Sequence, residues 1–114
     1  MTSAPPRFVR VRASIRLLGA AEGGRNTSLE GGVSYRPNHN FFDASNREMA
    51  MGFIDLPAGE RWLPGETKEM ELTFWTWPAL ESILTAGREW RVQEGPQLVG
   101  IGTVLEVLDS GAGG

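Results

Sequence analysis

Few side chains in this sequence could carry out acid–base, nucleophilic or metal chemistry. His39 is the only histidine and there is no cysteine, so a catalytic triad or a metal site would depend on that one imidazole. The sequence has no Gly-x-Ser-x-Gly elbow that would expose a nucleophilic serine. His39 and Asp43 together supply at most two ligands, fewer than a zinc site uses. These patterns indicate no catalytic residue and no metal site.

A nucleotide site is not indicated either. The pattern Gly-x-x-x-x-Gly-Lys-Ser/Thr is absent, so no loop of that kind is placed to hold phosphates and magnesium. Glu66, Glu69 and Glu71 follow a turn signal, and they are typical of a solvated strand face rather than of an acid–base pair. We therefore expect a protein that is not an enzyme, binds no nucleotide and needs no cofactor.

Length and composition indicate one globular domain. The chain has 114 residues, 40% hydrophobic and 22% charged, which suffices for a modest core. Its 15 glycines favour many turns between short strands. The net charge of −3 gives no general attraction to nucleic acid. Residues 1–7 lack the apolar run of a signal peptide and the next segment is rich in arginine, so we expect a cytoplasmic protein without membrane contact.

The elements that would position the side chains are predicted to be strands. Residues 8–18 alternate clearly, which predicts a half-buried strand. Its inward positions are apolar: Val9, Val11, Ala13, Ile15 and Leu17. Its outward positions form a basic stripe with one serine: Arg10, Arg12, Ser14 and Arg16. Such a stripe could hold a phosphate backbone or an acidic partner, although a solvated face is the commoner reason for one.

Further strands are expected at residues 33–36 with 41–43, 50–56, 67–75, 88–94 and 98–108, and a short helical turn within 79–85. In the last strand, Val99 and Ile101 are assigned to the core and Gly100 and Gly102 to the opposite face, where glycines allow another chain or a large side chain to approach closely. The predicted core comprises Val11, Ile15, Leu72, Phe74, Val99 and Ile101. Residues 1–7 are expected to be a disordered lead, 8–108 a six-stranded antiparallel β-barrel, and 109–114 a flexible tail.

Four segments carry a resemblance to a known family. Residues 22–37 read Glu-Gly-Gly-Arg-Asn-Thr-Ser-Leu-Glu-Gly-Gly-Val-Ser-Tyr-Arg-Pro, and residues 55–57 and 63–66 read Asp-Leu-Pro and Leu-Pro-Gly-Glu. Residues 94–104 read Glu-Gly-Pro-Gln-Leu-Val-Gly-Ile-Gly-Thr-Val. In this order and approximate spacing they resemble the C-terminal (third) β-barrel domain of the translation elongation factor Tu family, here without the GTPase domain that precedes it in the family.

The resemblance implies a binding surface. The third domain of elongation factor Tu packs on the GTPase domain and touches the T-stem backbone of aminoacyl-tRNA. At the tRNA-facing positions this chain keeps Arg25, Glu94 and Gly95. Neutral side chains replace several family residues there: Asn26 for a histidine, Trp77 for a lysine or histidine, Pro96 for a glycine, and Gln93 and Gln97 for arginines. With Arg36, which could instead serve the structure, the predicted partner-binding residues are Arg25, Asn26, Arg36, Trp77, Glu94, Gly95, Pro96 and Gln97.

Two functions follow as alternatives. The first is a binding module for a protein partner linked to translation, with the role of an adaptor, a decoy or an immunity protein against a toxin. The second is a small RNA-binding protein that retains T-stem recognition. The acidic balance and the neutral replacements favour the first, because lost phosphate contacts weaken RNA binding, whereas the basic stripe favours the second. Whether Trp62 and Trp77 are exposed, as interface tryptophans are, or buried at the ends of the barrel is left open by the sequence.

Overall fold

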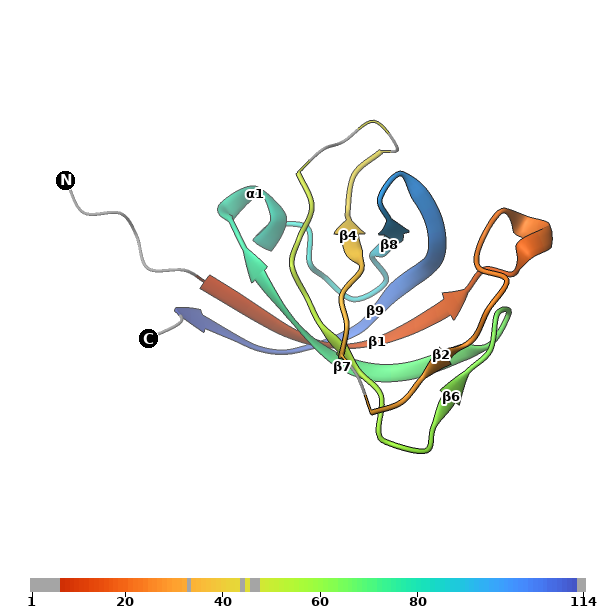
Figure 1. Ribbon diagram of the computed structural model, residues 1–114. Coiled ribbons are helices and arrows are strands. Elements are labelled where there is room, and N and C mark those ends of the chain that lie inside the picture. Colours follow the sequence, from red (N-terminus) through yellow and green to blue (C-terminus); the bar gives the residue numbers. More distant parts are fainter. Residues whose placement is uncertain (1–6, 33, 44, 46–47, 113–114) are drawn as a thin grey trace.

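The computed structural model describes residues 7–32, 34–43, 45 and 48–112, and it has an all-β architecture, as the sequence predicts (Figure 1). Five strands form one antiparallel sheet in the order β4-β8-β9-β1-β7. Their bounds are β1 Arg7–Leu17, β4 Asn38–Asn40, β7 Thr67–Thr76, β8 Glu89–Glu94 and β9 Gln97–Ala112.

Two short antiparallel strand pairs and two single turns of helix complete the regular structure of the described part. The first pair joins β2 (Leu29–Glu30) to β6 (Arg61–Trp62), and the second joins β3 (Ser34–Tyr35) to β5 (Ile54–Asp55). A 3-10 turn, η1, covers Ala20–Glu22, and α1 covers Pro78–Glu81. The helical turn expected within 79–85 therefore begins one residue earlier, at a proline that suits the first helical position.

The strand β1 lies at the centre of the sheet and pairs antiparallel with both β7 and β9. Its alternation works as predicted: Val11, Ala13 and Ile15 are fully buried, and Val11 stands opposite Leu72 of β7. Two irregularities in the pairing with β9, at Arg10/Val11 and Arg12/Ala13, bend the sheet, because each leaves an extra residue on one strand.

The core is built around aromatic side chains. Phe41 and Trp90 stack with their ring centres 5.1 Å apart, and Phe74 meets both edge-on at 5.3 and 5.5 Å. His39 also packs edge-on against Phe74 at 5.0 Å. Burying an aromatic side chain of this size stabilises the fold by about 2–3 kcal/mol each, so this group holds β4, β7 and β8 together.

The predicted orientation of the last strand is confirmed at Val99, which is fully buried, but it is wrong from Gly100 onward, after an irregularity in the pairing with β8. Val104 is fully buried while Ile101 is only half-buried, so β9 presents Gly100, Gly102 and Val104 to the core rather than Ile101. The physical reason is Trp90: a Cβ atom on Gly102 would lie 2.4 Å from its indole ring. A large side chain from the neighbouring strand thus fills the space that the glycines leave, and both faces of β9 look apolar in the sequence.

The two edges of the sheet are linked through residues 50–51. Ala50 exchanges two backbone hydrogen bonds with His39 of β4, at 2.8 and 3.3 Å, and the Trp75 N–H of β7 donates to the Met51 carbonyl at 3.1 Å. Among the described residues no strand-to-strand ladder joins β4 to β7. The strand predicted at 50–56 is therefore reduced to these bridges and β5, and the pairing expected at 41–43 lies at β4 instead.

The boundaries of the domain differ from the prediction at the C-terminal side. Residues 109–112 belong to β9 instead of a flexible tail, because the first half of β1 offers them a pairing edge and Arg10 stands opposite Asp109. Arg7, expected in the lead, is the first residue of β1. Residues 1–6 and 113–114 lie outside the described part. None of the helices described is both long and apolar enough to cross a membrane.

Candidate functional site

The loop after β1 positions Arg25 through two glycines. Gly23 adopts a φ of 80°, which glycine reaches without strain, and it ends the turn η1. A Cβ atom on Gly24 would lie 2.2 Å from the carbonyl oxygen of Leu18, so only glycine fits there. The Arg25 N–H then donates to the same carbonyl at 3.1 Å. The pair of glycines therefore folds the chain back on the end of β1 and directs Arg25 across it.

Arg25, Tyr35 and Glu94 meet at one carboxylate oxygen, and we call them the Arg25 cluster. The Arg25 guanidinium and the Tyr35 hydroxyl both donate to Oε2 of Glu94. Arg25 is also held by Thr27, through the backbone oxygen at 3.2 Å and the hydroxyl at 3.1 Å. Burial, and then the Glu94 carboxylate, raise the pKa of Tyr35 above its ordinary value, so the hydroxyl stays protonated and keeps donating.

The turn between β8 and β9 completes this surface. Gly95 adopts a φ of 60° in that turn, and the Gln97 amide donates to the carbonyls of Gly23 and Gly24, each at 3.0 Å. A hollow of about 360 Å³ opens between the two loops, lined by Ala20, Gly24, Arg25, Asn26, Thr27, Glu94 and Gln97. The structure therefore brings together Arg25, Asn26, Glu94 and Gln97 of the predicted site, with Gly95 and Pro96 in the adjoining turn.

Trp77, one of the predicted site residues, lies far from the Arg25 cluster. Trp77 follows β7, whose last residue pairs with Arg7, whereas the turn before β9 lies near Leu17. The eleven residues of β1 span about 35 Å, and Figure 1 shows α1 and the orange loop after β1 at opposite ends of the molecule. The expected proximity of Trp77 to the loop around Gly95 is therefore wrong.

Trp62 and Trp77 pack against the core, whereas Arg36 is exposed and lies over an aromatic ring. Trp77 is partly buried against the core, and Trp62 is fully buried with its indole N–H donating to the Glu66 carbonyl at 3.0 Å. The guanidinium carbon of Arg36 lies 4.7 Å from the centre of the Phe53 ring. Arg36 points away from the Arg25 cluster because it alternates with Tyr35 along an extended chain.

The basic stripe of β1 is neutralised by carboxylates from both sides. Arg10 pairs with Glu71 at 2.6 Å and Asp109 at 2.9 Å. Arg12 lies 3.4 Å from Glu69 and 3.7 Å from Glu106, and Arg16 pairs with Glu22 at 2.9 Å; the partners thus come from β7, β9 and η1. A phosphate backbone laid along this face would meet five carboxylates beside three guanidiniums.

The single histidine has a structural place. His39 is fully buried, its Nε2 donates to the Gly52 carbonyl at 2.7 Å, and its Nδ1 accepts from the Trp90 indole at 3.0 Å. Burial lowers the pKa of His39 to about 4, so the ring is neutral near pH 7 and both nitrogens are occupied. This histidine holds residues 50–52 against β4 and β8.

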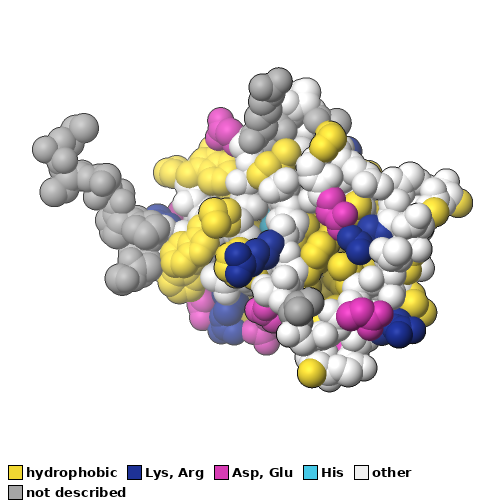
Figure 2. All heavy atoms as spheres, viewed as in Figure 1, with side chains coloured by type: hydrophobic (Ala, Val, Ile, Leu, Met, Phe, Trp, Pro, Cys, Tyr) yellow, Lys and Arg dark blue, Asp and Glu magenta, His cyan; other side chains and the backbone are white. Residues whose placement is uncertain are grey.

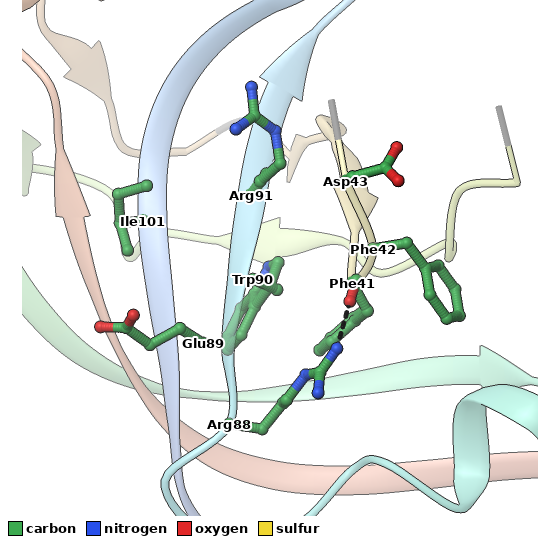
Figure 3. A pocket seen from close by; sticks show the side chains of 8 residues that line it. All are labelled: Phe41, Phe42, Asp43, Arg88, Glu89, Trp90, Arg91 and Ile101. Carbon is green, nitrogen blue, oxygen red and sulfur yellow. Dashed lines mark hydrogen bonds between the residues drawn. The ribbon is translucent and has the colours of Figure 1, made fainter. Parts of the chain in front are cut away.

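A second hollow, of about 510 Å³, lies where β4 and β8 separate (Figure 3). Arg88 donates to the Phe41 carbonyl at 2.6 Å, while Arg91 and Glu89 point away from that contact in Figure 3. These side chains do not converge on one point. In the part of the chain that the structure describes, no three His, Cys, Asp or Glu side chains are grouped to hold a metal ion.

One surface was missed by the sequence analysis. Met51, Phe53 and Trp75 are exposed around a hollow of about 320 Å³ between residues 51–55 and β7. The alternation of β7 carried a signal, because a strand that buries Leu72 and Phe74 must expose Trp75. No known family model matches the sequence.

Proposed function

We propose that this domain is a non-catalytic binding module that resembles the third domain of elongation factor Tu and recognises a protein partner linked to translation. The observation that supports the proposal is the Arg25 cluster. Its members come from the Glu-Gly-Gly-Arg, Tyr-Arg-Pro and Glu-Gly pieces of the resemblance, yet Tyr35 and Arg25 are 59 and 69 residues from Glu94 in sequence. Contact between separate motif pieces is expected if they serve one surface.

We also propose that the sheet corresponds to the six-stranded antiparallel barrel of that family, with residues 50–56 in the sixth position. The bridges that Ala50 and Met51 make to β4 and β7 support this, since they occupy the only gap between the sheet edges in the strand order. A barrel leaves few free edges, which suits a small domain.

The charges favour a protein partner over RNA. Arg25 is already paired with Glu94, and the stripe of β1 is paired with carboxylates on neighbouring strands. The residues exposed beside Arg25, namely Asn26, Pro96 and Gln97, are neutral. With such a surface, the domain could bind a protein that normally recognises elongation factor Tu. It would then act in the cytoplasm as an adaptor, a decoy or a toxin-immunity protein.

Absence of catalysis and of nucleotide binding is part of the same proposal. The one histidine is neutral, buried and bonded at both nitrogens, so it is not placed to transfer protons with a substrate. We expect titration calorimetry with GTP and magnesium to give no saturable heat. Micromolar GTP binding would contradict the proposal.

The RNA alternative is tested by fluorescence anisotropy with a T-stem-loop RNA hairpin over a series of salt concentrations. We expect only non-specific affinity, about 10⁻⁴ to 10⁻⁶ M at physiological salt, and the same salt dependence for Arg25→Ala. If the domain retains T-stem recognition, binding is tighter and Arg25→Ala lowers the salt slope by about one unit. That second result would contradict the proposed protein partner and show that the domain recognises RNA.

A further inference from the structure

Most arginines in the described part of the chain already face a carboxylate. Ion pairs with acidic side chains are formed by Arg7, Arg10, Arg12, Arg16, Arg25 and Arg61. Figure 2 shows basic side chains next to acidic ones on the face that it presents. Arg88 and Arg91 differ, because neither forms an ion pair with any described residue. Both line the hollow of about 510 Å³ where β4 and β8 separate, which therefore holds two cationic groups without an ion-pair partner.

Arg88 is the less satisfied of the two. Its Nη2 donates to the Phe41 carbonyl at 2.6 Å, but its Nε is buried and has no hydrogen-bond partner. A guanidinium has five N–H donors, and a charge that is partly removed from water without a counter-charge costs free energy. A carboxylate bound in the hollow would recover part of that cost through attraction and charge-assisted hydrogen bonds.

The hollow exists because the chain after β4 turns away from β8. The buried Asn40 accepts the Phe42 N–H on its Oδ1 at 2.9 Å and donates to the Asp43 carbonyl at 2.8 Å. These local bonds replace the ladder, so the pairing of β4 with β8 ends at Asn40 and Arg91.

Backbone groups of β8 face the side that β4 has left. The Val104 N–H of β9 donates to the Arg88 carbonyl at 2.8 Å. Because hydrogen-bonding directions alternate along an antiparallel strand, the N–H and C=O of the next residue, Glu89, point toward the side of β4. Within the described part of the chain no hydrogen bond satisfies either group there. A ligand that satisfies both must offer an acceptor and a donor.

The rest of the lining is apolar, with two carboxylates at its margins. Phe42 is 38% exposed and Ile101 is half-buried. The Asp43 carboxylate accepts the N–H and the hydroxyl of Ser45, at 3.0 and 2.6 Å. Figure 3 shows Glu89 directed away from Phe42. An apolar side chain can therefore lie against Phe42 without meeting either carboxylate.

We propose that the hollow between β4 and β8 binds an extended, acidic peptide segment of a partner protein. Arg88 and Arg91 point to opposite ends of the hollow in Figure 3, and three residues of extended chain separate their Cα atoms by about 10 Å. A single small anion does not span that distance, whereas carboxylates on one face of a peptide do. An apolar side chain between them packs on Phe42, and the peptide backbone pairs with Glu89.

The lining favours a peptide over a nucleic acid. A phosphodiester chain offers acceptors but no amide donor for the Glu89 carbonyl. It also carries a charge at every nucleotide, so phosphates that miss the two arginines would meet Asp43 and Glu89. This hollow shares no lining residue with the one beside Arg25, and the proposal does not depend on the function proposed above.

Fluorescent synthetic peptides of about seven residues test the proposal by anisotropy with the whole chain. In the first peptide two glutamates flank a leucine and threonines alternate with them, so that the three chosen side chains share one face. We expect it to bind about tenfold more tightly than its glutamine counterpart, and about tenfold more tightly than a version with alanine in place of leucine. Equal affinity for the glutamate and glutamine peptides, or no binding by either, overturns the proposal.

A matched pair of charge reversals separates this site from the overall charge. Arg91 donates only to the Gln93 side chain, at 3.3 Å, so Arg91→Glu should stay folded. It should bind the glutamate peptide at least about tenfold more weakly and prefer a version with lysines in place of the glutamates. Arg61→Glu makes the same charge change on β6 and should leave both affinities unchanged. Equal losses in the two variants would overturn the proposal.

Two further variants test the charges at the other end of the hollow. Arg88→Gln keeps an amide that can donate to the Phe41 carbonyl but loses the charge, so it should remain folded and bind the glutamate peptide about tenfold more weakly. Glu89→Gln removes a repulsive carboxylate and should tighten binding about threefold. Unchanged affinity in both variants would overturn the proposal.

Two other occupants are tested with the same peptide and variants. An oligouridine of about eight nucleotides at equal concentration should not displace the glutamate peptide. The chain should also stay monomeric in sedimentation over the concentrations used. Displacement by the RNA, or a concentration-dependent dimer that Arg91→Glu abolishes, would overturn the proposal in favour of RNA or of a second copy of the chain.

Discussion

The Arg25 cluster and the outer edge of β7 hold their polar groups in opposite ways. In the cluster, Arg25 has Thr27 and Glu94 as partners, and Glu94 also accepts from Tyr35. At the edge, Asp55 and the outward backbone groups of Glu71 have no partner among the described residues. The first surface is preorganised, so a partner meets a fixed shape and loses little conformational entropy there. The second runs beside residues 51–55 with a single backbone bridge, from Met51 to Trp75, so its geometry is less constrained.

The two surfaces share one scaffold, and the largest expected effect tests it. Val104→Asp should abolish folding and with it both surfaces, because a carboxylate replaces a fully buried side chain at a cost of several kcal/mol. Ile101→Asp, three residues away on the half-buried face, should remain folded. Thermal unfolding followed by circular dichroism measures both. If Ile101→Asp unfolded while Val104→Asp stayed folded, Ile101 rather than Val104 would face the core, as the sequence predicted.

The next largest effect is a loss of stability at low pH that comes from His39 and that should differ between the two surfaces. The folded pKa of His39 is about 4, below its ordinary 6.5, so its contribution to stability is complete above pH 6.5 and is lost as the pH falls toward 4. The free energy of unfolding should drop by about 3 kcal/mol over this interval. Because His39 bonds the Gly52 carbonyl, we expect the β7 edge to loosen before the Arg25 cluster does.

Urea titrations between pH 7 and 4, with His39→Gln as the control, measure the size of this effect. In this variant, the part of the pH dependence of the unfolding free energy that comes from His39 should be absent. A single imidazole resonance that titrates near 6.5 in the folded protein would contradict the buried, neutral ring.

A smaller effect distinguishes satisfied from free polar groups. Tyr35→Phe removes a donor to the Glu94 carboxylate and should lower the free energy of unfolding by about 1–2 kcal/mol. Asp55→Asn, at the other surface, should change it by less than about 0.5 kcal/mol, since no partner is lost. Equal losses in chemical denaturation would show that the contrast between the surfaces is wrong.

The smallest effect concerns the basic stripe. Arg12→Ala should lower stability by less than about 1 kcal/mol, because its ion pairs are exposed and such pairs contribute little. The loss should shrink further at high salt. A large loss of RNA binding in this variant would instead give the stripe a role in recognition.

The sequence predicted much of the fold because alternation fixes the faces of β1 and β7. It failed for β9, where glycines admit Trp90 from β8 and the strand looks apolar on both faces. No pattern within one strand could reveal that its neighbour fills its core positions.

The candidate site was predicted in part. The motifs located Arg25, Asn26, Glu94 and Gln97, which meet at one hollow. They misplaced Trp77, because its distance from the site depends on which end of β1 the strand β7 reaches. The sequence also could not predict that carboxylates neutralise the basic stripe of β1, because Arg10 pairs with residues that are 61 and 99 positions away.

The central claim is that the surface beside Arg25 binds a protein. Its most direct test is the quantitative capture of proteins from nuclease-treated lysate of the native cell by the wild-type domain and two tryptophan variants. Asn26→Trp blocks the surface at an exposed position, and Ala79→Trp adds the same side chain at an exposed position in α1, near the opposite end of β1. We expect one protein to be retained by the wild type and by Ala79→Trp, and to be lost with Asn26→Trp. Capture that disappears with nuclease treatment, or that Asn26→Trp leaves intact, would contradict the account.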